Sequence, residues 1–523
     1  MERLKLIPYP TSVELFEGNV DCKEIDLVGE ACFASDFFKD FAQKNSLTLS
    51  DNGVKIQYSI DSALAIDEEG YLLEISQDGI RINANSKKGL NYAFCSLVHL
   101  FSNYNGVLPY CKIQDEPYLK FRGMLLDVGR YFFPVEEVLK YVDFCFLNKL
   151  NVLHWHLTED QGWRIEIDKY PLLTQKGSRR SHTNFGIKPH SGFYTKEQIR
   201  QVIAYANERN VEVMPEIDLP GHAQAALACY PYLGCFDRKL PVATHWGVKH
   251  DPLCAGKEST YEWVFNMLDE VIELFGGNTK YIHIGGDEVF RHRWKLCEHC
   301  QATIAKYGLK DEEELQAHFM RRVCEFVVSK GCIPMAWNGV DVDKTVHEKV
   351  VWQFWSDERG GSERLVQSLA HQSGGYLNSN SKYNYVDFPY GMTSLKQSYE
   401  MTPLPEGMDR DKLVGAELTL WTEYIPNFKK ACRYLLPRTP ALAENMWNDG
   451  EKNYQEFEQR LVPTLELFNK QGFKSASLKW ANPSKLLGKC QTAWFNRRVL
   501  HWQGLHNLID DAYVTRKYGK KRK

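Results

Sequence analysis

Hydrophobic and polar residues alternate in short runs near the start of the chain, and a helical stripe follows them. Residues 53–60, 71–76 and 79–85 have the apolar content and short length typical of half-buried strands, bounded by turn residues. Residues 87–103 instead place apolar side chains three and four positions apart, as one face of a helix requires. The pattern predicts a separate small α+β domain over residues 1–117.

From residue 118 the pattern changes to apolar runs that alternate with amphipathic helical segments. This alternation predicts an α/β fold, a (β/α)8 TIM barrel with insertions over residues 118–450, and leaves a doubly wound open sheet as the runner-up. Residues 451–523 are expected to form a C-terminal helical extension packed on the barrel, with a basic tail at RKYGKKRK. The eight runs expected as barrel strands are residues 121–129, 151–157, 211–217, 281–286, 333–337, 350–355, 374–380 and 413–421.

The composition is that of an ordinary globular protein. Hydrophobic residues make up 43% of the 523 residues, charged residues make up 25%, and the formal net charge is −3. This near-neutral balance gives no electrostatic reason to expect nucleic acid or an anionic membrane as a partner. No apolar run reaches the roughly 18 residues that a membrane-spanning helix needs.

The first residues and the cysteines together predict a location. The opening stretch MERLKLIPYPTSVELF has no apolar core and no cleavage site of a secretory signal. Fourteen cysteines are scattered without the regular spacings of a disulfide framework, which favours reduced thiols. We therefore expect a cytoplasmic protein, unless a leader was trimmed from the sequence.

Residues at the carboxyl ends of the strands face the active site in a barrel of this kind. Carboxylates, histidines, one arginine and repeated tryptophans collect at these ends. Carboxylates together with tryptophans point to glycosyl chemistry, because an acid protonates the glycosidic oxygen while aromatic rings hold the sugar. The strand-end residues are Asp127, Arg130, His154, His156, Glu159, Asp160, Glu216, Asp218, His222, Asp287, Glu288, Trp337, Trp355, Trp421 and Glu423.

Asp287 and Glu288 are adjacent, which is unusual for a pair of catalytic carboxylates. Ordinary retaining glycosidases place two carboxyls on opposite sides of the bond, about 5–5.5 Å apart, whereas neighbouring side chains on a strand diverge. The pair is better suited to two tasks on one side of the sugar: one protonates the leaving oxygen, and the other holds a nucleophile that the substrate supplies. A like charge nearby would help keep one carboxyl protonated, and Gly285 and Gly286 would let the sugar approach the backbone.

The chain resembles the family 20 glycoside hydrolases, the β-N-acetylhexosaminidases, over about residues 118–450, and residues 1–117 are similar to the small N-terminal domain of that family. The resemblance implies a (β/α)8 barrel that removes terminal β-linked GlcNAc or GalNAc. It implies a retaining, substrate-assisted mechanism through an oxazolinium ion, with no cofactor and no metal. The resemblance rests on HIGGDE, RGMLLDVGRYFFP, NKLNVLHWHLTEDQGWRIEI, PEIDLPGHAQAAL and ELTLWTEY.

The same resemblance implies roles for the residues that react with the sugar or hold it. Glu288 would be the general acid/base, and Asp287 would orient the acetamido nitrogen. Tyr385 would hydrogen-bond the acetamido oxygen. Arg130 would grip the 3- and 4-hydroxyls, and Glu423 the 4- and 6-hydroxyls.

The remaining matching positions would shape the pocket. Asp387 would contact a sugar hydroxyl, and His222 would belong to the network that supports the acid. The aromatic walls would be Trp337, Trp355 and Trp421, whose strand-end positions favour the pocket over a plain place in the barrel core.

Glu159 is a departure from the pattern, because most members of the family are expected to have Asp there. Its extra methylene would shift the network that tunes Glu288. We therefore expect an effect on the pH optimum rather than on the reaction itself.

Two short segments contain residues that could bind a metal, but each has a simpler interpretation. His154 and His156 share one face of a strand, but no third ligand stands at a recognisable spacing, so hydrogen-bonded core histidines are favoured. The CEHC segment supplies Cys297 and Cys300, only two of the four ligands of a zinc site, and reduced thiols in a loop are favoured. Cys254, in an insertion expected to rim the pocket, is interpreted as structural.

The sequence as a whole predicts an exo-acting β-N-acetylhexosaminidase whose partner is a glycan with a terminal N-acetylhexosamine. A catalytically silent amino-sugar-binding protein is one alternative, and hydrolysis of a chromogenic substrate would exclude it. A metal-dependent hydrolase built on His154, His156 and His222 is another, and it would lose activity with a chelator. The choice between GlcNAc and GalNAc, the natural glycan and the oligomeric state are left open.

Overall fold

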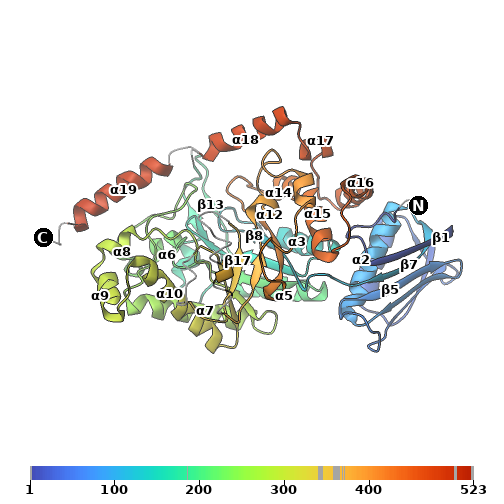
Figure 1. Cartoon of the computed structure of the whole chain (residues 1–523), viewed down its shortest axis with the longest axis horizontal. Helices are drawn as coiled ribbons and strands as arrows, with labels where there is room; N and C mark the ends of the chain where they lie inside the picture. The colour runs from blue at the N-terminus through green and yellow to red at the C-terminus, as the bar shows by residue number, and fades with distance from the viewer. Residues whose placement is uncertain are drawn as a thin grey trace.

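The computed structural model shows a small N-terminal domain beside a large barrel, with α18 and α19 running along the outside of the barrel (Figure 1). The last four residues of the expected basic tail lie outside the described residues. The structure describes residues 3–184, 186–339, 346–356, 365–367, 369, 372–499 and 503–519.

The N-terminal domain is a seven-stranded mixed sheet with two helices, and its strand order is β1-β7-β5-β6-β4-β2-β3. The three apolar runs of the sequence form β4, β5 and β6. In β5 the alternate residues Tyr71, Leu73 and Ile75 are buried, because every second side chain faces the helices. The elements are β1 (Ser12–Asp21), β2 (Glu24–Val28), α1 (Phe33–Lys44), β3 (Thr48–Leu49), β4 (Val54–Ile60), β5 (Tyr71–Ser76), β6 (Gly79–Ala84), α2 (Lys87–Asn103) and β7 (Val107–Asp115).

Helix α2 lies between this sheet and the barrel (Figure 1). The sequence predicts a single apolar stripe, but every residue from Gly89 to Phe101 is buried. The reason is that the sheet covers one side of the helix and the barrel with α16 covers the other. Gly89 packs so closely on the residue before β5 that a Cβ atom there would lie 2.1 Å from the Gly70 carbonyl oxygen.

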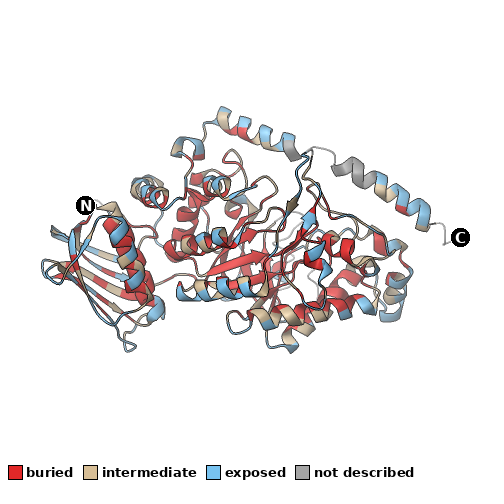
Figure 2. Ribbon diagram, turned by 180° about the vertical axis from the view of Figure 1, so that it is seen from behind, coloured by how far each residue is buried: buried red, intermediate tan, exposed pale blue. Residues whose placement is uncertain are grey.

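Eight parallel strands close the barrel, which confirms the predicted (β/α)8 architecture and excludes the open sheet. The strands follow the chain order, and β19 pairs with β8 to complete the circle, with Gly415 opposite Phe121. Figure 2 shows that these strands are buried. The strands are β8 (Phe121–Asp127), β9 (Val152–His156), β14 (Glu212–Glu216), β15 (Tyr281–His283), β16 (Ile333–Trp337), β17 (Val351–Phe354), β18 (Tyr376–Asn378) and β19 (Leu413–Leu420).

Helices surround the barrel, and several begin at a residue that caps them. Thr195 forms a capping box with Gln198, and the Asp311 carboxylate accepts hydrogen bonds from the first turn of α10. The main outer helices are α3 (Val135–Leu147), α5 (Lys196–Glu208), α7 (Glu258–Phe275), α10 (Glu312–Ser329), α14 (Phe428–Leu435) and α15 (Arg438–Trp447). The short elements are β10 (Thr158–Glu159), β11 (Gly162–Trp163), α4 (Leu172–Gln175), β12 (Arg179–Arg180), β13 (His190–Ser191), α6 (Gln224–Cys229), η1 (Pro231–Leu233), α8 (His292–Leu296), α9 (Glu298–Tyr307), α12 (Ser381–Asn384), α13 (Leu395–Tyr399) and η2 (Arg410–Lys412).

The barrel interior changes from apolar to polar along its axis. The lower layer contains Phe121, Val152, Met214, Met335, Val351 and Leu377. Since alternate strand residues point inward, the next layer holds the residues two positions further on. These residues are Gly123, His154, Glu216, Trp337, Gln353 and Ser379, and they form the floor beneath the strand ends.

Hydrogen bonds and ion pairs join the residues of this floor. His154 Nδ1 lies 2.9 Å from Glu417 Oε1, and His154 Nε2 lies 3.0 Å from Glu216 Oε2. Gln353 Nε2 donates to Glu417 Oε1 at 2.6 Å. Burial opposes protonation of His154, but Glu417 and Glu216 raise its pKa to about 9. His154 is therefore a hydrogen-bonded core residue, as the sequence favours, whereas His156 lies one layer nearer the pocket.

Buried charges hold the N-terminal domain against the barrel. Lys149 Nζ lies 2.6 Å from Asp115 Oδ2, which also accepts a hydrogen bond from the Tyr71 hydroxyl at 2.6 Å. Asp115 Oδ1 accepts from Trp447 Nε1 at 2.8 Å and from the Thr11 backbone N–H at 3.1 Å. Both carboxylate oxygens thus have partners from both domains.

Four helices follow the last barrel helix. α16 packs against α2, whereas α18 and α19 continue along the outside to the end opposite the N-terminal domain (Figure 1). Within the described part of the chain, each helix is too short or too polar to pass through a bilayer. The four helices are α16 (Tyr454–Lys470), α17 (Leu478–Ala481), α18 (Lys485–Val499) and α19 (Gln503–Tyr518).

Candidate active site

A cavity of about 330 Å3 opens at the carboxyl ends of the barrel strands, where the sequence predicts the site. Small-molecule sites are typically about 300–1,000 Å3, so this cavity suits a single sugar ring rather than an extended chain. Every residue to which the family resemblance assigns a role, except Trp337, lines it, whereas the strand-end residues Asp127, His154, Asp160 and Glu216 do not. The lining residues are Arg130, His156, Glu159, Gln161, Asp218, His222, Trp246, Gly247, Val248, Asp287, Glu288, Trp355, Tyr385, Asp387, Phe388, Trp421, Glu423, Tyr424 and Phe495.

Trp337, which the sequence predicts as a wall of the pocket, lies behind the wall instead. Its side chain is buried, and its Nε1 donates a hydrogen bond of 2.7 Å to Glu216 Oε1 in the barrel floor. Its ring centroid is 5.6 Å from that of Trp421, which does line the cavity. Trp337 therefore supports Trp421 from inside the barrel.

A tight turn after β15 positions the two adjacent carboxylates. Gly285 and Gly286 have φ angles of +64° and +108°, and Glu288 itself has a φ of +50°. A Cβ atom at Gly285 would lie 1.7 Å from Asp218 Oδ1, and the Gly286 N–H donates to that same oxygen at 3.2 Å. The glycines thus serve the left-handed turn and the contact with Asp218, and the close approach of a sugar that the sequence suggests stays a prediction.

Asp287 points into the cavity with one oxygen free. Its Oδ1 is buried and has no hydrogen-bond partner among the residues that the structure describes. Burial raises the pKa of Asp287 to about 7; His222 opposes this shift and the neighbouring Glu288 adds to it. The Asp287 carboxyl therefore holds a proton in the empty pocket at mildly acidic pH.

Glu288 has the opposite protonation behaviour. Its side chain is 40% exposed, and its Oε2 lies 3.4 Å from His222 Nε2. Burial alone would raise the pKa of Glu288, but the contact with His222, together with the charge of Arg130, lowers it below its usual value. The sequence predicts that a like charge keeps one carboxyl of the pair protonated. That carboxyl is Asp287, because His222 lies beside Glu288 and favours its anionic form.

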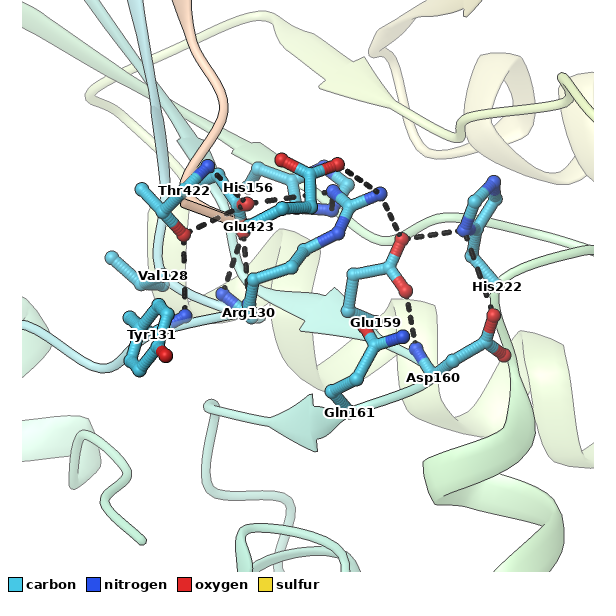
Figure 3. Close-up of polar contacts among 12 residues, drawn as sticks. Val128, Arg130, Tyr131, His156, Glu159, Asp160, Gln161, His222, Thr422 and Glu423 are labelled. Carbon is cyan, nitrogen blue, oxygen red and sulfur yellow. Dashed lines mark hydrogen bonds and ion pairs between the residues drawn. The ribbon is translucent and has the colours of Figure 1, made fainter. Parts of the chain in front are cut away.

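Glu159 connects Arg130 to His222, as Figure 3 shows. Its Oε1 lies 2.6 Å from Arg130 Nη2 and 2.5 Å from His222 Nδ1. Although burial disfavours the charge, Arg130 and His222 lower the pKa of Glu159 to about 2. Burial likewise opposes the charge on His222, but Glu159 and Asp218 raise its pKa well above the usual value. The chain Arg130–Glu159–His222–Glu288 therefore alternates in sign.

Asp127 fixes the turn from which Arg130 reaches the pocket. Its Oδ1 accepts hydrogen bonds from the backbone N–H groups of Gly129 and Arg130 at 2.9 and 3.1 Å. Its Oδ2 accepts from the backbone and hydroxyl of Thr422, which follows β19, at 3.0 and 2.9 Å. Asp127 is thus a strand-end carboxylate with a positioning role, since both of its oxygens are occupied within the fold.

Tyr385 and Asp387 face the cavity from the loop after α12. Burial raises the pKa of Tyr385 well above 10, which keeps its hydroxyl protonated and able to donate. Burial and the charge of Glu423 raise the pKa of Asp387 well above its usual value, and its Oδ1 is buried without a partner in the described residues. Arg438 donates to the carbonyl oxygens of Val386 and Phe388 and so holds this loop in place.

The aromatic walls are anchored from outside the pocket. Trp355 donates from its indole N–H to the Asn338 carbonyl oxygen at 2.8 Å. Trp421 has the Arg130 guanidinium 5.0 Å from its ring centroid and the His156 ring edge-on at 5.1 Å. These contacts fix the two rings in orientations that a sugar face can meet.

Part of the lining was not predicted from the sequence. Trp246, Gly247 and Val248 come from the insertion between β14 and α7, where a tryptophan beside a glycine is the only hint. Phe495 comes from α18, and its ring lies 5.3 Å from that of Tyr424. The hydrophobic pattern of residues 485–499 predicts a helix, but it does not predict that one of its side chains reaches the pocket.

The three histidines of the metal-dependent alternative do not meet. His154 binds Glu216 and Glu417 in the barrel floor, whereas His222 pairs with Glu159 and Glu288 at the pocket. Among the described residues, no group of close ligand atoms contains both His154 and His222. The geometry therefore does not support that alternative.

A second groove of about 920 Å3 lies between α14, α17 and α18. Lys430, Arg433, Trp480 and Trp494 line it, and its described lining includes no carboxylate. It therefore lacks a group that could act as the acid in glycosyl transfer.

Two family models match nearly the whole length up to α15. The model of "Glycosyl hydrolase family 20, catalytic domain" matches residues 119–450, and the model of domain 2 of the same family matches residues 3–116. Most pocket residues lie in the first match, whereas Phe495 follows it.

Individual relatives agree with these matches. A β-hexosaminidase of Porphyromonas gingivalis is 36% identical over 492 residues, covering 88% of this chain and 62% of that protein. A β-hexosaminidase of Vibrio furnissii is 33% identical over 404 residues, covering 72% and 65%. The chain thus spans less than two thirds of the length of these two relatives. A solved family 20 exo-β-N-acetylglucosaminidase of Vibrio harveyi, in complex with N-acetylglucosamine, superposes with a TM-score of 0.79 at 26% identity, over 91% of this chain and 78% of that one.

Proposed function

The chain belongs to glycosyl hydrolase family 20, and on this premise we propose that it is an exo-acting β-N-acetylhexosaminidase. The observation that carries the proposal is the placement of Asp287 and Glu288 side by side at one edge of a cavity of about 330 Å3. Asp287 keeps a buried oxygen that has no hydrogen-bond partner in the described part of the chain, and Glu288 lies near the mouth beside His222.

The substrate would be a glycan whose terminal N-acetylhexosamine fills the cavity. The volume suits one ring, and the Vibrio harveyi relative was solved with N-acetylglucosamine, which supports this sugar as a ligand. The free oxygens of Asp287 and Asp387 provide acceptors for its amide N–H and a hydroxyl. A cytoplasmic location stays a prediction from the sequence.

In the first chemical step, the carbonyl oxygen of the acetamido group attacks C1 while Glu288 gives its proton to the glycosidic oxygen. The bond between C1 and that oxygen breaks, and an oxazolinium ion forms. Asp287 accepts the amide N–H and stabilises the positive charge that develops there, while Tyr385 donates to the acetamido oxygen. In the second step, Glu288 takes a proton from water, which attacks C1 and opens the oxazolinium with overall retention.

The protonation states of the empty pocket are compatible with this sequence of events. Between the two pKa values, the Asp287–Glu288 pair shares one proton, which lies mainly on Asp287. An amide N–H donated to Asp287 favours its anionic form. Because two adjacent anions repel each other, the proton is then better placed on Glu288. Substrate binding would thereby protonate Glu288, the residue that acts as the general acid.

The test compares Glu288→Gln with Asp287→Asn on substrates with good and poor leaving groups. Glu288→Gln should lose about 10²–10⁴-fold in kcat/KM on a poor leaving group, such as a second sugar, and much less on an aryl glycoside that needs no proton. Asp287→Asn should lose about 10²–10³-fold on both, because charge stabilisation is needed for either.

Equal losses for the two variants on every substrate would contradict these roles. An analogue that carries a hydroxyl in place of the acetamido group provides a second check. Cleavage of that analogue at the normal rate, or isolation of a glycosylated carboxylate, would contradict the substrate-assisted mechanism.

A further inference from the structure

Four cysteine thiols from separate segments meet outside the active site. Cys235 and Cys254 stand at the two ends of the loop that follows η1, and Cys297 and Cys300 begin α9. Cys254 Sγ lies 3.7 Å from Cys297 Sγ and 3.6 Å from Cys300 Sγ, and Cys235 Sγ lies 3.9 Å from Cys300 Sγ. All four sulfur atoms lie within 4.8 Å of one another.

The three individual distances are close to those in a tetrahedron of sulfur ligands. A disulfide would bring two sulfurs to about 2.05 Å, so the four thiols are not paired covalently. A zinc ion with Zn–S bonds of about 2.3 Å holds its four sulfurs about 3.8 Å apart. We propose that Cys235, Cys254, Cys297 and Cys300 bind one structural zinc ion.

The surrounding backbone is built to hold the four sulfurs together. Cys254, Cys297 and Cys300 are buried, at 1% exposure or less. The loop after Cys254 touches α9 so closely that a Cβ atom at Gly256 would lie 2.2 Å from the His299 carbonyl carbon. Trp294 Nε1, from the preceding α8, donates to the Leu253 carbonyl oxygen at 3.0 Å.

The ligand chemistry favours a soft metal ion such as zinc, in a structural role. Four thiolates are soft ligands that disfavour magnesium and calcium, and a complete tetrahedron leaves no position for a reacting water. The CxxC segment alone supplies half of this set. The other half is remote in sequence, with Cys254 43 residues before Cys297 and Cys235 65 residues before Cys300, which is why the spacing did not reveal it.

The site would fix the loop that forms one rim of the pocket. The loop between Cys235 and Cys254 carries Trp246, Gly247 and Val248, which line the cavity. A metal that joins both ends of a loop removes conformational freedom from it, as a cross-link does.

The same segments form the docking site of α19. Arg238, three residues after Cys235, pairs with Asp251 at 3.1 Å. Arg293 of α8 lies 2.7 Å from both Asp510 and Asp511 of α19. The zinc ion would thus hold together the pocket rim, the start of α9 and the surface that receives α19.

The direct test is the metal content of the protein purified without metal-affinity chromatography. We expect about one zinc ion per chain in the wild type and in the control Cys490→Ser, whose cysteine is exposed and remote from the cluster. Cys254→Ser and Cys300→Ser should lose most of the zinc. Zinc-free wild-type protein, iron in place of zinc, or zinc that survives both substitutions would overturn the proposal.

A second measurement covers the case in which a cysteine variant fails to fold. Zinc is displaced from the folded wild type with a thiol-reactive mercurial, and its release is followed with a colorimetric chelator. Reduced, metal-free protein is then compared with zinc-reloaded protein by hydrogen exchange. We expect faster exchange over residues 235–256 in the metal-free protein and unchanged exchange in α2. Equal exchange over residues 235–256 in the two states would overturn the structural role.

Discussion

Two clusters of buried charge in this protein differ in how far their carboxylates are hydrogen-bonded within the fold. At the domain interface, Asp115 has hydrogen-bond partners on both oxygens and an ion pair of 2.6 Å with Lys149. In the pocket, Asp287 and Asp387 each keep a buried oxygen without a hydrogen-bond partner among the described residues. The interface carboxylate is satisfied by the fold, whereas the pocket carboxyls leave acceptors that a ligand can satisfy.

The comparison explains the direction of the pKa shifts in the pocket. Burial raises the pKa of Asp287 to about 7 and that of Asp387 well above its usual value, since His222 and Arg438 compensate these charges only in part. An uncompensated buried carboxylate costs free energy in the empty protein. Changes at the interface should therefore reduce stability, and changes in the pocket should reduce activity.

The largest expected effect comes from breaking the interface pair. Lys149→Met leaves Asp115 buried and unpaired, so the free energy of unfolding should fall by about 3–5 kcal/mol. Urea denaturation measures this change. The matched control is Lys23→Met, whose exposed pair with Asp21 should contribute less than about 1 kcal/mol. Equal free energies of unfolding for the two variants would contradict the stabilising role of the pair between Lys149 and Asp115.

The next effect separates activity from stability in the pocket. Under the proposed function, Asp387→Asn replaces a carboxyl that contacts a sugar hydroxyl, and kcat/KM should fall by about 10- to 100-fold, which corresponds to about 1.4–2.7 kcal/mol. The melting temperature should stay the same or rise, because an uncompensated carboxyl is removed. A variant that loses stability along with activity would show that Asp387 is a structural group.

The pH profile of the activity tests the role of His222, the cation that lowers the pKa values of Asp287 and Glu288. His222 lowers the pKa values of both Asp287 and Glu288, so its removal should raise both. Both limbs of the kcat/KM profile of His222→Asn should therefore move to higher pH, by about one unit. Asparagine is chosen because the backbone here has a φ of +47°, which asparagine tolerates. An unmoved profile with lower activity would indicate a purely structural residue.

The smallest effect concerns Glu159, the departure from the family pattern. Glu159→Asp keeps the charge between Arg130 and His222 but shortens the side chain, so kcat/KM should change by less than about fivefold, or about 1 kcal/mol. Glu159→Gln removes the charge and should have the larger effect on both rate and pH profile. A greater loss in the aspartate variant would mean that length, rather than charge, is what the network requires.

The fold and most of the pocket were predictable because they depend on local pattern and strand position. The barrel strands are continuous apolar runs, and Asp287, Glu288 and Arg130 stand where such runs end. Trp337 was misplaced because a strand-end side chain can face either the pocket or the layer beneath it. The distinction depends on the register of the barrel, which a single strand does not encode.

Other features depend on contacts between remote segments. Cys235 and Cys254 join Cys297 and Cys300 only because the insertion after β14 folds over α9. The protonation of Asp287 rather than Glu288 depends on the location of His222, which comes from another strand end. Neither the hydrophobic pattern nor the spacing of residues along the chain predicts which of these remote side chains lie close together.

Phe495 has a consequence for how selectivity can vary in this molecule. It reaches the pocket from α18, which lies outside the ring of strands that carries the reacting carboxyls. Under the proposed function, substitutions along that helix would reshape the passage for the departing part of a glycan while the reacting groups keep their geometry. The choice of aglycone would then vary at the periphery of the molecule, independently of the chemistry at its centre.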